Sequence, residues 1–201
     1  KTSYFKINFS FFNCDFPFFH VFLASFGISY MNYQSIISQN SFIEQKLLEV
    51  EKLLENPNCS GVFYNASTDL DAVGVRIGIL EKRFGKTDVR VLDQKKLYSL
   101  LEYYHFNIIK KLNSNCDTGF TTILFFYSNE ENLVEESERT GYILDSFKGE
   151  NPSIMIYSFD SLLDYEVINN LKVAYNISFA PSVVINEGEP FYLSNLDQLN
   201  P

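Results

Sequence analysis

The sequence predicts an α/β protein, because its hydrophobic pattern changes partway along the 201-residue chain. Residues 41–113 repeat apolar side chains every three to four positions, which is typical of helices that pack against one another. Later, short β-branched and aromatic runs alternate with helical stretches and turn residues, which is typical of strands connected by helices. We therefore expect three parts: an apolar anchor or arm over 1–36, a helical layer with an antiparallel hairpin over 37–117, and an α/β domain over 118–201.

Composition and motif content exclude several classes of function. The chain has 25 acidic and 16 basic residues, a formal charge of −9, and a nucleic-acid binder needs a positive surface. Its two histidines and three cysteines form no CxxC, HxxH or HExxH motif, so we expect no metal site. No glycine-rich phosphate loop occurs, so we expect no cofactor. His105 stands among aromatic residues and is expected to pack rather than to act as a base.

A phenylalanine-rich segment near the start of the sequence permits two interpretations. Residues 16–31 are nearly all apolar and follow Lys1 and Lys6, an order typical of a signal segment or membrane anchor. A membrane would then be contacted through residues 12–31, and the rest of the chain would be membrane-anchored or exported, in an extracytoplasmic location. Sixteen residues are fewer than the roughly twenty that a spanning helix needs, so the alternative is a buried strand pair or an arm that makes contacts in an oligomer.

Three helices are predicted before the strands begin. They cover about residues 41–55, 68–84 and 87–113, with a capping box at the start of the first and Gly85 at the end of the second. Apolar side chains define the faces that we expect to pack: Leu70, Val73, Ile77, Leu80 and Phe84 in the second helix, and Leu97, Leu101, Tyr104, Ile108 and Leu112 in the third.

The remaining residues predict the order β-α-β-α-β-β-α. We expect strands over 121–127, 153–159, 182–186 and 190–192, and helices over 131–148, 161–175 and 195–199. The first strand is a continuous β-branched and aromatic run, which is typical of a strand buried on both faces. An acidic-Gly turn at Glu187 and Gly188 joins the last two strands.

Residues 180–186, with the sequence APSVVIN, resemble the end of the thioredoxin fold together with the turn and hairpin that follow. In that family a proline that is cis to its predecessor leads an apolar strand, and Pro181 takes that place. The resemblance covers residues 118–201 and implies a thioredoxin-like β-α-β-α-β-β-α unit, here preceded by a three-helix layer and an apolar N-terminal segment. The arrangement also resembles uncharacterised membrane-anchored thioredoxin-like proteins of small-genome archaea, which bears on localisation only.

The cysteine pair of the thioredoxin family is missing from the corresponding positions. Family enzymes carry CxxC at the start of the first helix, where the helix N-terminus stabilises a thiolate. Those positions fall at 129–132 or at 134–137, where Val134 and Ser137 would replace the two cysteines. Because a hydroxyl cannot replace a thiolate in disulfide exchange, we expect no catalytic residues and no enzyme activity.

Two of the three cysteines are predicted to form a disulfide. Cys59 follows the first helix and Cys116 follows the third, so a chain that runs down, up and down again places both at the same end of the helical layer. Such a bond requires an oxidising compartment, which agrees with an exported domain. The alternative is two unrelated buried thiols, and Cys14 is left as a buried thiol in the apolar segment.

Three functional hypotheses remain. The first is a non-catalytic domain that acts through protein or peptide contacts, with Phe179, Ala180 and Pro181 forming a peptide-binding groove, although the same loop could be retained for folding alone. The second is a structural subunit that self-associates through its aromatic arm into an oligomer or filament. The third is an atypical thiol-disulfide oxidoreductase that uses Cys59 and Cys116 as a remote pair.

Overall fold

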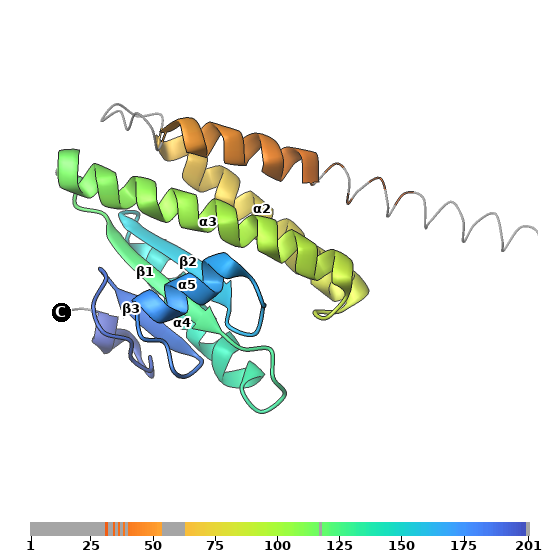
Figure 1. Ribbon diagram of the computed structural model, residues 1–201. Helices are drawn as coiled ribbons and strands as arrows, with labels where there is room; N and C mark the ends of the chain where they lie inside the picture. The colour runs from red at the N-terminus through yellow and green to blue at the C-terminus, as the bar shows by residue number, and fades with distance from the viewer. Residues whose placement is uncertain are drawn as a thin grey trace, which may run out of the picture. The chain divides into compact units, whose positions relative to one another are not determined.

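The computed structural model describes residues 40–53, 63–116 and 118–199, together with positions 31, 34, 36 and 38. Residues 40–53 are helical, and two long helices, α2 (Phe63–Phe84) and α3 (Val89–Cys116), follow (Figure 1). Strands and helices then alternate: β1 (Thr121–Tyr127), α4 (Val134–Glu150), β2 (Ile154–Asp160), α5 (Glu166–Ala174) and β3 (Ser182–Ile185). The predicted α/β class, with three helices ahead of the strands, is confirmed.

The sheet has three strands in the order β2-β1-β3. β1 pairs in parallel with β2, so that Tyr127 lies opposite Asp160 at the end of both strands. β1 pairs in antiparallel fashion with β3, where Phe126 lies opposite Ser182. The central strand β1 is buried along its middle five residues, as its β-branched and aromatic run predicted.

The prediction of a fourth strand is wrong. In place of a strand over residues 190–192, the described part of the chain has a single bridge in which Phe191 and Val183 exchange two backbone hydrogen bonds of 2.9 Å. Pro190 has no N–H to donate, so the ladder cannot extend through it. In place of the helix predicted over 195–199, the chain forms a short 3-10 helix, Leu196–Leu199.

Helix boundaries also differ from those predicted. α2 begins at Phe63, five residues early. α4 begins later than expected because Glu130 first closes a turn, in which its carbonyl accepts the N–H groups of Leu133 and Val134. α5 also begins late, because Asp160 accepts the N–H of Leu162 through its side chain and holds the chain after β2 in a turn.

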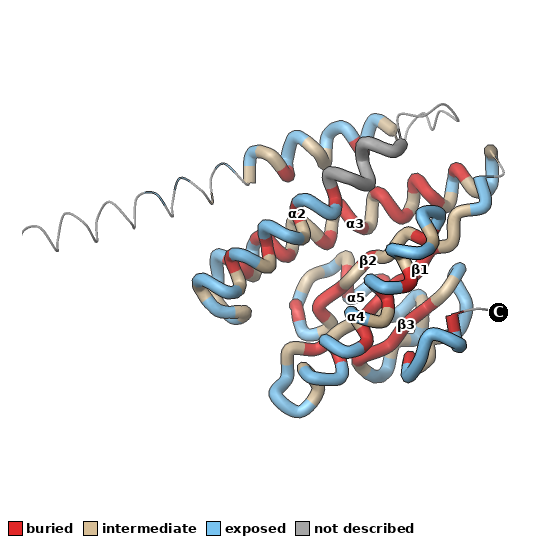
Figure 2. Tube along the Cα trace, turned by 180° about the vertical axis from the view of Figure 1, so that it is seen from behind, coloured by how far each residue is buried: buried red, intermediate tan, exposed pale blue. Residues whose placement is uncertain are grey.

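Alternate residues of β1 contribute to two separate hydrophobic cores. Leu124 and Phe126 pack in a core with residues of α3 and α5, whereas Ile123 and Phe125 pack in a second core with residues of α4. α3 and α5 therefore cover one face of the sheet and α4 the other (Figure 1). Buried positions gather along α3 and the strands (Figure 2).

The two long helices form the predicted hairpin. Four of the five seam residues of α2 are buried: Leu70, Val73, Ile77 and Leu80. Gly85 ends α2 with a φ of +93°, a conformation that favours glycine, as predicted. Asp88 then accepts the backbone N–H of Arg90 at 2.9 Å, which caps the start of α3.

Gly74 on α2 allows the close approach of Tyr98 on α3. A Cβ atom at Gly74 would lie 2.9 Å from the Tyr98 hydroxyl oxygen, whereas one at Gly78 would meet nothing within 4 Å. We expect Gly78→Ala to stabilise the protein by up to about 1 kcal/mol through helix propensity. Gly74→Ala should instead destabilise it by about 1–3 kcal/mol through overpacking.

Urea unfolding of both variants tests this expectation. In a Tyr98→Phe background the nearest ring atom to the new Cβ would be the Cζ, at 3.4 Å, so the penalty of Gly74→Ala should largely disappear. Equal effects of the two glycine substitutions in the wild-type background would contradict the close contact.

Several predictions concern residues outside the described part of the chain. These are most of the apolar segment, including residues 12–30, and the cysteines Cys14 and Cys59. Among the residues that are described, no helix combines the length and the apolar character needed to cross a bilayer. α2, α3 and the sheet belong to one compact unit that begins at Phe42.

Candidate functional site

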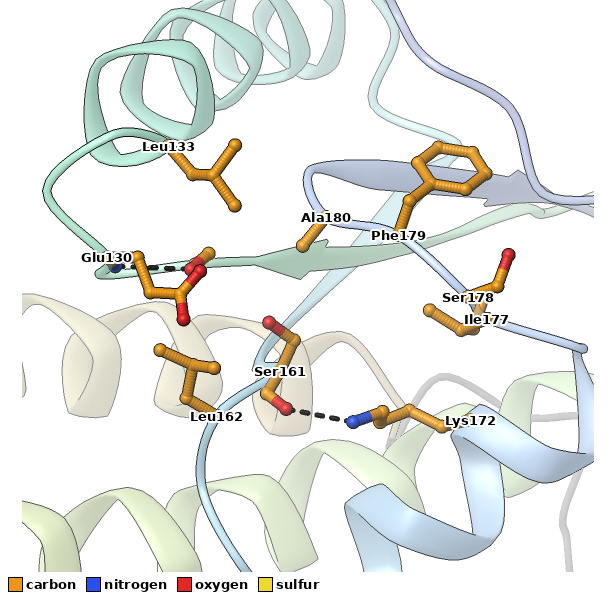
Figure 3. A pocket seen from close by; sticks show the side chains of 10 residues that line it. Glu130, Leu133, Ser161, Leu162, Lys172, Ile177, Ser178, Phe179 and Ala180 are labelled. Carbon is orange, nitrogen blue, oxygen red and sulfur yellow. Dashed lines mark hydrogen bonds between the residues drawn. The ribbon is translucent and has the colours of Figure 1, made fainter.

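A pocket of about 290 Å³ opens where β1 and β2 end (Figure 3). Four segments line it: Ser128, Glu130 and Leu133 after β1, Ser161 and Leu162 after β2, Lys172 on α5, and residues 177–180 before β3. Because the carboxyl ends of parallel strands meet at one edge of a sheet, loops that are distant in sequence converge there. We call this pocket the Ala180 groove.

The predicted residues Phe179, Ala180 and Pro181 form the segment that leads into β3. The peptide bond between Ala180 and Pro181 is cis, as the family resemblance implies. Phe179 and Ala180 line the groove, and Phe179 is 42% exposed. Pro181 is buried beside them. The structure thus brings two of the three predicted residues to the surface of one pocket.

The backbone of this segment presents unused hydrogen-bonding groups. Within the part of the chain that the structure describes, neither Phe179 nor Ala180 makes a backbone hydrogen bond. The flanking residues are fixed, because Ile177 donates to the Lys172 carbonyl at 2.8 Å and Val183 pairs with the chain at Phe191. A short stretch of unpaired backbone donors and acceptors, at exposed Phe179 and half-buried Ala180, therefore lies between two anchored points and could pair with another chain.

The positions predicted to replace the two cysteines lie in the first turn of α4 and do not line the groove. Ser137 is buried, and its hydroxyl accepts the Ser128 backbone N–H at 3.0 Å. It therefore ties the β1–α4 loop to the helix. Val134 is half-buried beside it. The residue that faces the groove from this turn is Leu133, whose side chain points toward Ala180 (Figure 3).

The side chains that line the groove are chemically mixed. None of its ten lining residues is a cysteine or a histidine, so they offer neither a thiolate nor an imidazole. Its walls combine aliphatic and aromatic side chains with one carboxylate, of Glu130, and one ammonium, of Lys172. Across the described residues, no group of three or more His, Cys, Asp or Glu side chains is placed to hold a metal ion.

A buried ion cluster that the sequence analysis missed fixes two loops of the groove. The Asp160 side chain is buried at the end of β2, and its Oδ2 atom accepts Lys95 Nζ at 2.9 Å and Asn129 Nδ2 at 2.7 Å. Its Oδ1 atom accepts the Leu162 N–H at 3.1 Å. Lys95 also contacts Glu81 at 2.6 Å. One carboxylate thus holds the chain after β1 and the chain after β2.

Two further predicted residues lie away from the groove. His105 is buried in α3, and its Nδ1 atom lies 2.9 Å from the Tyr157 hydroxyl, so it packs in the core as expected. Cys116 is the last residue of α3 and packs against the same core. Because Cys59 lies outside the described residues, the disulfide between the two cysteines stays a prediction.

Two other pockets lie near the amino end of β1 and the turn after β3, and both include Lys110 and Glu187. These two side chains form an ion pair with each other, and Tyr175 donates a hydrogen bond to Glu187 at 3.2 Å. Their charges are therefore already neutralised within the chain. The Ala180 groove differs in that its carboxylate and its ammonium group are not paired with opposite charges in the described part of the chain.

Comparison of the chain with models of protein families, with curated proteins and with solved structures finds no match. The structure itself shows a small α/β domain with a mixed three-stranded sheet.

Proposed function

We propose that this chain contains a thioredoxin-like domain that binds an extended peptide segment of a partner protein in the Ala180 groove, without catalysis and without a cofactor. The order β1-α4-β2-α5-β3, the antiparallel pairing of β3 and the cis bond before Pro181 support the fold assignment. The proposal includes an extracytoplasmic location, anchored or exported, on the basis of the apolar residues 16–31 and the predicted disulfide.

The observation that carries the proposal is the unpaired backbone of Phe179 and Ala180, which both line the groove beside apolar side chains. In strand addition, main-chain hydrogen bonds supply affinity, and pockets for alternate side chains supply specificity. Leu133 faces Ala180 across the groove, and Leu162 is 54% exposed at its rim. Both can cover apolar side chains of a peptide that pairs with Ala180.

The proposal excludes disulfide exchange at this groove. The first turn of α4 carries Glu135 and Glu136, and carboxylates disfavour the thiolate that the reaction needs. The full chain should therefore fail to reduce insulin disulfides in the presence of a thiol reductant. Turnover above the rate of the reductant alone would overturn the non-catalytic assignment and support the remote pair of Cys59 and Cys116.

Ala180→Trp is expected to weaken peptide binding strongly, because an indole at this position fills the groove and blocks the backbone beside it. The probes are capped peptides of alternating valine and threonine, labelled for fluorescence anisotropy and screened first as an array. We expect the affinity of the full chain to fall by about tenfold or more, the equivalent of about 1.4 kcal/mol.

Ala72→Trp is the matched control, since Ala72 is exposed on α2 and lies outside the residues that line the groove. This variant should bind as the wild type does. If no extended peptide binds the wild-type chain, or if both tryptophan variants bind equally well, the groove is not a peptide site.

A further inference from the structure

We propose that the Ala180 groove selects a peptide by two charges that flank the segment pairing with Ala180. The residue on the N-terminal side of that segment is basic, and the residue on its C-terminal side is acidic. The inference rests on the proposed function and adds the chemical class and the direction of the ligand. It is carried by two charged side chains, Glu130 and Lys172, which lie toward opposite ends of the groove with Ala180 and Ser161 between them (Figure 3).

Both charges are available to a ligand. The carboxylate of Glu130 is exposed and makes no hydrogen bond or ion pair in the described part of the chain. Lys172 Nζ donates to the Ser161 carbonyl at 3.0 Å, which orients the ammonium group into the groove and leaves two of its three donors unused. No carboxylate among the described residues forms an ion pair with it.

The direction of the ligand follows from the direction of the loop. The chain runs from Ser178, on the side of Lys172, to Ala180, on the side of Leu133 and Glu130 (Figure 3). Pro181 has no N–H, so pairing cannot continue past Ala180 toward β3 and the available stretch is short. In an antiparallel pair one residue exchanges both of its backbone hydrogen bonds with a single partner residue, which suits so short a stretch.

An antiparallel peptide therefore runs from the Glu130 end to the Lys172 end. A lysine or arginine N-terminal to the pairing segment would lie toward the carboxylate of Glu130. An aspartate or glutamate C-terminal to it would lie toward the ammonium group of Lys172. Because side chains alternate along a strand, residues two positions apart project to the same side and can line the groove together.

Three capped and labelled peptides test the inference against the full chain by fluorescence anisotropy. Each has a Val-Thr-Val core. The forward peptide has a lysine before the core and a glutamate after it, the reversed peptide exchanges these two residues, and the neutral peptide has glutamine at both positions. We expect the forward peptide to bind about two- to fivefold more tightly than the neutral one for each charge, and the reversed peptide to bind more weakly.

The variant Glu130→Lys should remove the preference for the basic residue, and adding Lys172→Glu should reverse the order of the forward and reversed peptides. Glu131→Lys is the matched control, because Glu131 is the next residue, is exposed and lies outside the groove lining. Glu130 is itself exposed, so its substitution tests the inference even if the variant at Lys172 fails to fold.

The outcomes separate this inference from the proposed function. Equal affinities for the three peptides would overturn the charge preference and leave peptide binding in place. Tighter binding of the reversed peptide would overturn the direction. Absence of binding by all three, and by every peptide in the array, would overturn the proposed function and this inference with it.

Discussion

Lys95→Met is expected to lower the free energy of unfolding by about 3–5 kcal/mol, the typical penalty for removing one partner of a buried ion pair. The side chain of Lys95 is only 4% exposed, and its ammonium group contacts Asp160 at 2.9 Å and Glu81 at 2.6 Å. Without it, the Asp160 carboxylate keeps its hydrogen bonds from Asn129 and Leu162 but remains buried without a countercharge. Urea unfolding of the full chain measures the loss.

Lys96→Met is the matched control for this effect. Lys96 is the next residue on α3, its side chain is 40% exposed, and its ion pair with Asp93 is long at 3.8 Å. Exposed pairs of this kind contribute about 0–1 kcal/mol, so the control should change stability little. Equal effects of the two substitutions would show that Lys95 does not neutralise a buried charge.

A second substitution identifies the cause of the loss. Asp160→Asn, added to Lys95→Met, removes the uncompensated charge and keeps one side-chain oxygen, which can accept the Leu162 N–H, while the hydrogen bond from Asn129 to the other oxygen is lost. We expect this double variant to be more stable than Lys95→Met alone, because the loss of packing and of one hydrogen bond costs less than an uncompensated buried charge. If Asp160→Asn destabilises both backgrounds equally, the two side chains are not coupled.

The sequence predicted much of the local structure because several signals act over a few residues. The β-branched run at 121–127 forms the central strand, and Gly85 ends α2. The prediction of a fourth strand was wrong. Phe191 is an aromatic residue of the kind that favours strands, but Pro190 before it lacks the N–H donor that a ladder requires. The fold class was therefore more predictable than the width of the sheet.

The groove and the buried polar residues were less predictable because they depend on contacts between distant segments. The family resemblance pointed to residues 179–181, but Leu133, Leu162 and Lys172 come from three other segments. α3 packs against α2 on one side and the sheet on another. A helix covered on two sides has no single polar face, so the spacing of its apolar residues does not reveal that Lys95 is buried.

Two buried groups of α3 are expected to give the stability of the protein opposite dependences on pH. Burial lowers the pKa of His105 to about 4, from an ordinary value of 6.5. Burial raises the pKa of Glu102 well above its ordinary value of 4.5, although the Ser158 N–H that it accepts at 2.7 Å opposes the shift. Both side chains are 1% exposed.

The sign of each effect follows from which state binds the proton. Below pH 6.5 the unfolded chain protonates His105 and the folded chain does not, so stability falls as the pH drops toward 4, by about 3 kcal/mol in all. Above pH 4.5 the unfolded chain releases the Glu102 proton and the folded chain retains it, so stability falls as the pH rises toward the higher folded pKa. Between pH 4.5 and 6.5 the two effects oppose each other.

Differences between variants and wild type isolate each group, because titrations common to both chains cancel. Relative to wild type, Glu102→Gln should become more stable as the pH rises above 4.5, with a slope of about 1.4 kcal/mol per pH unit, since its amide still accepts the Ser158 N–H. His105→Gln should become relatively more stable as the pH falls from 6.5 to about 4. Urea unfolding between pH 4 and 8 therefore yields two difference curves of opposite slope, and two flat curves would show that neither group is buried away from water.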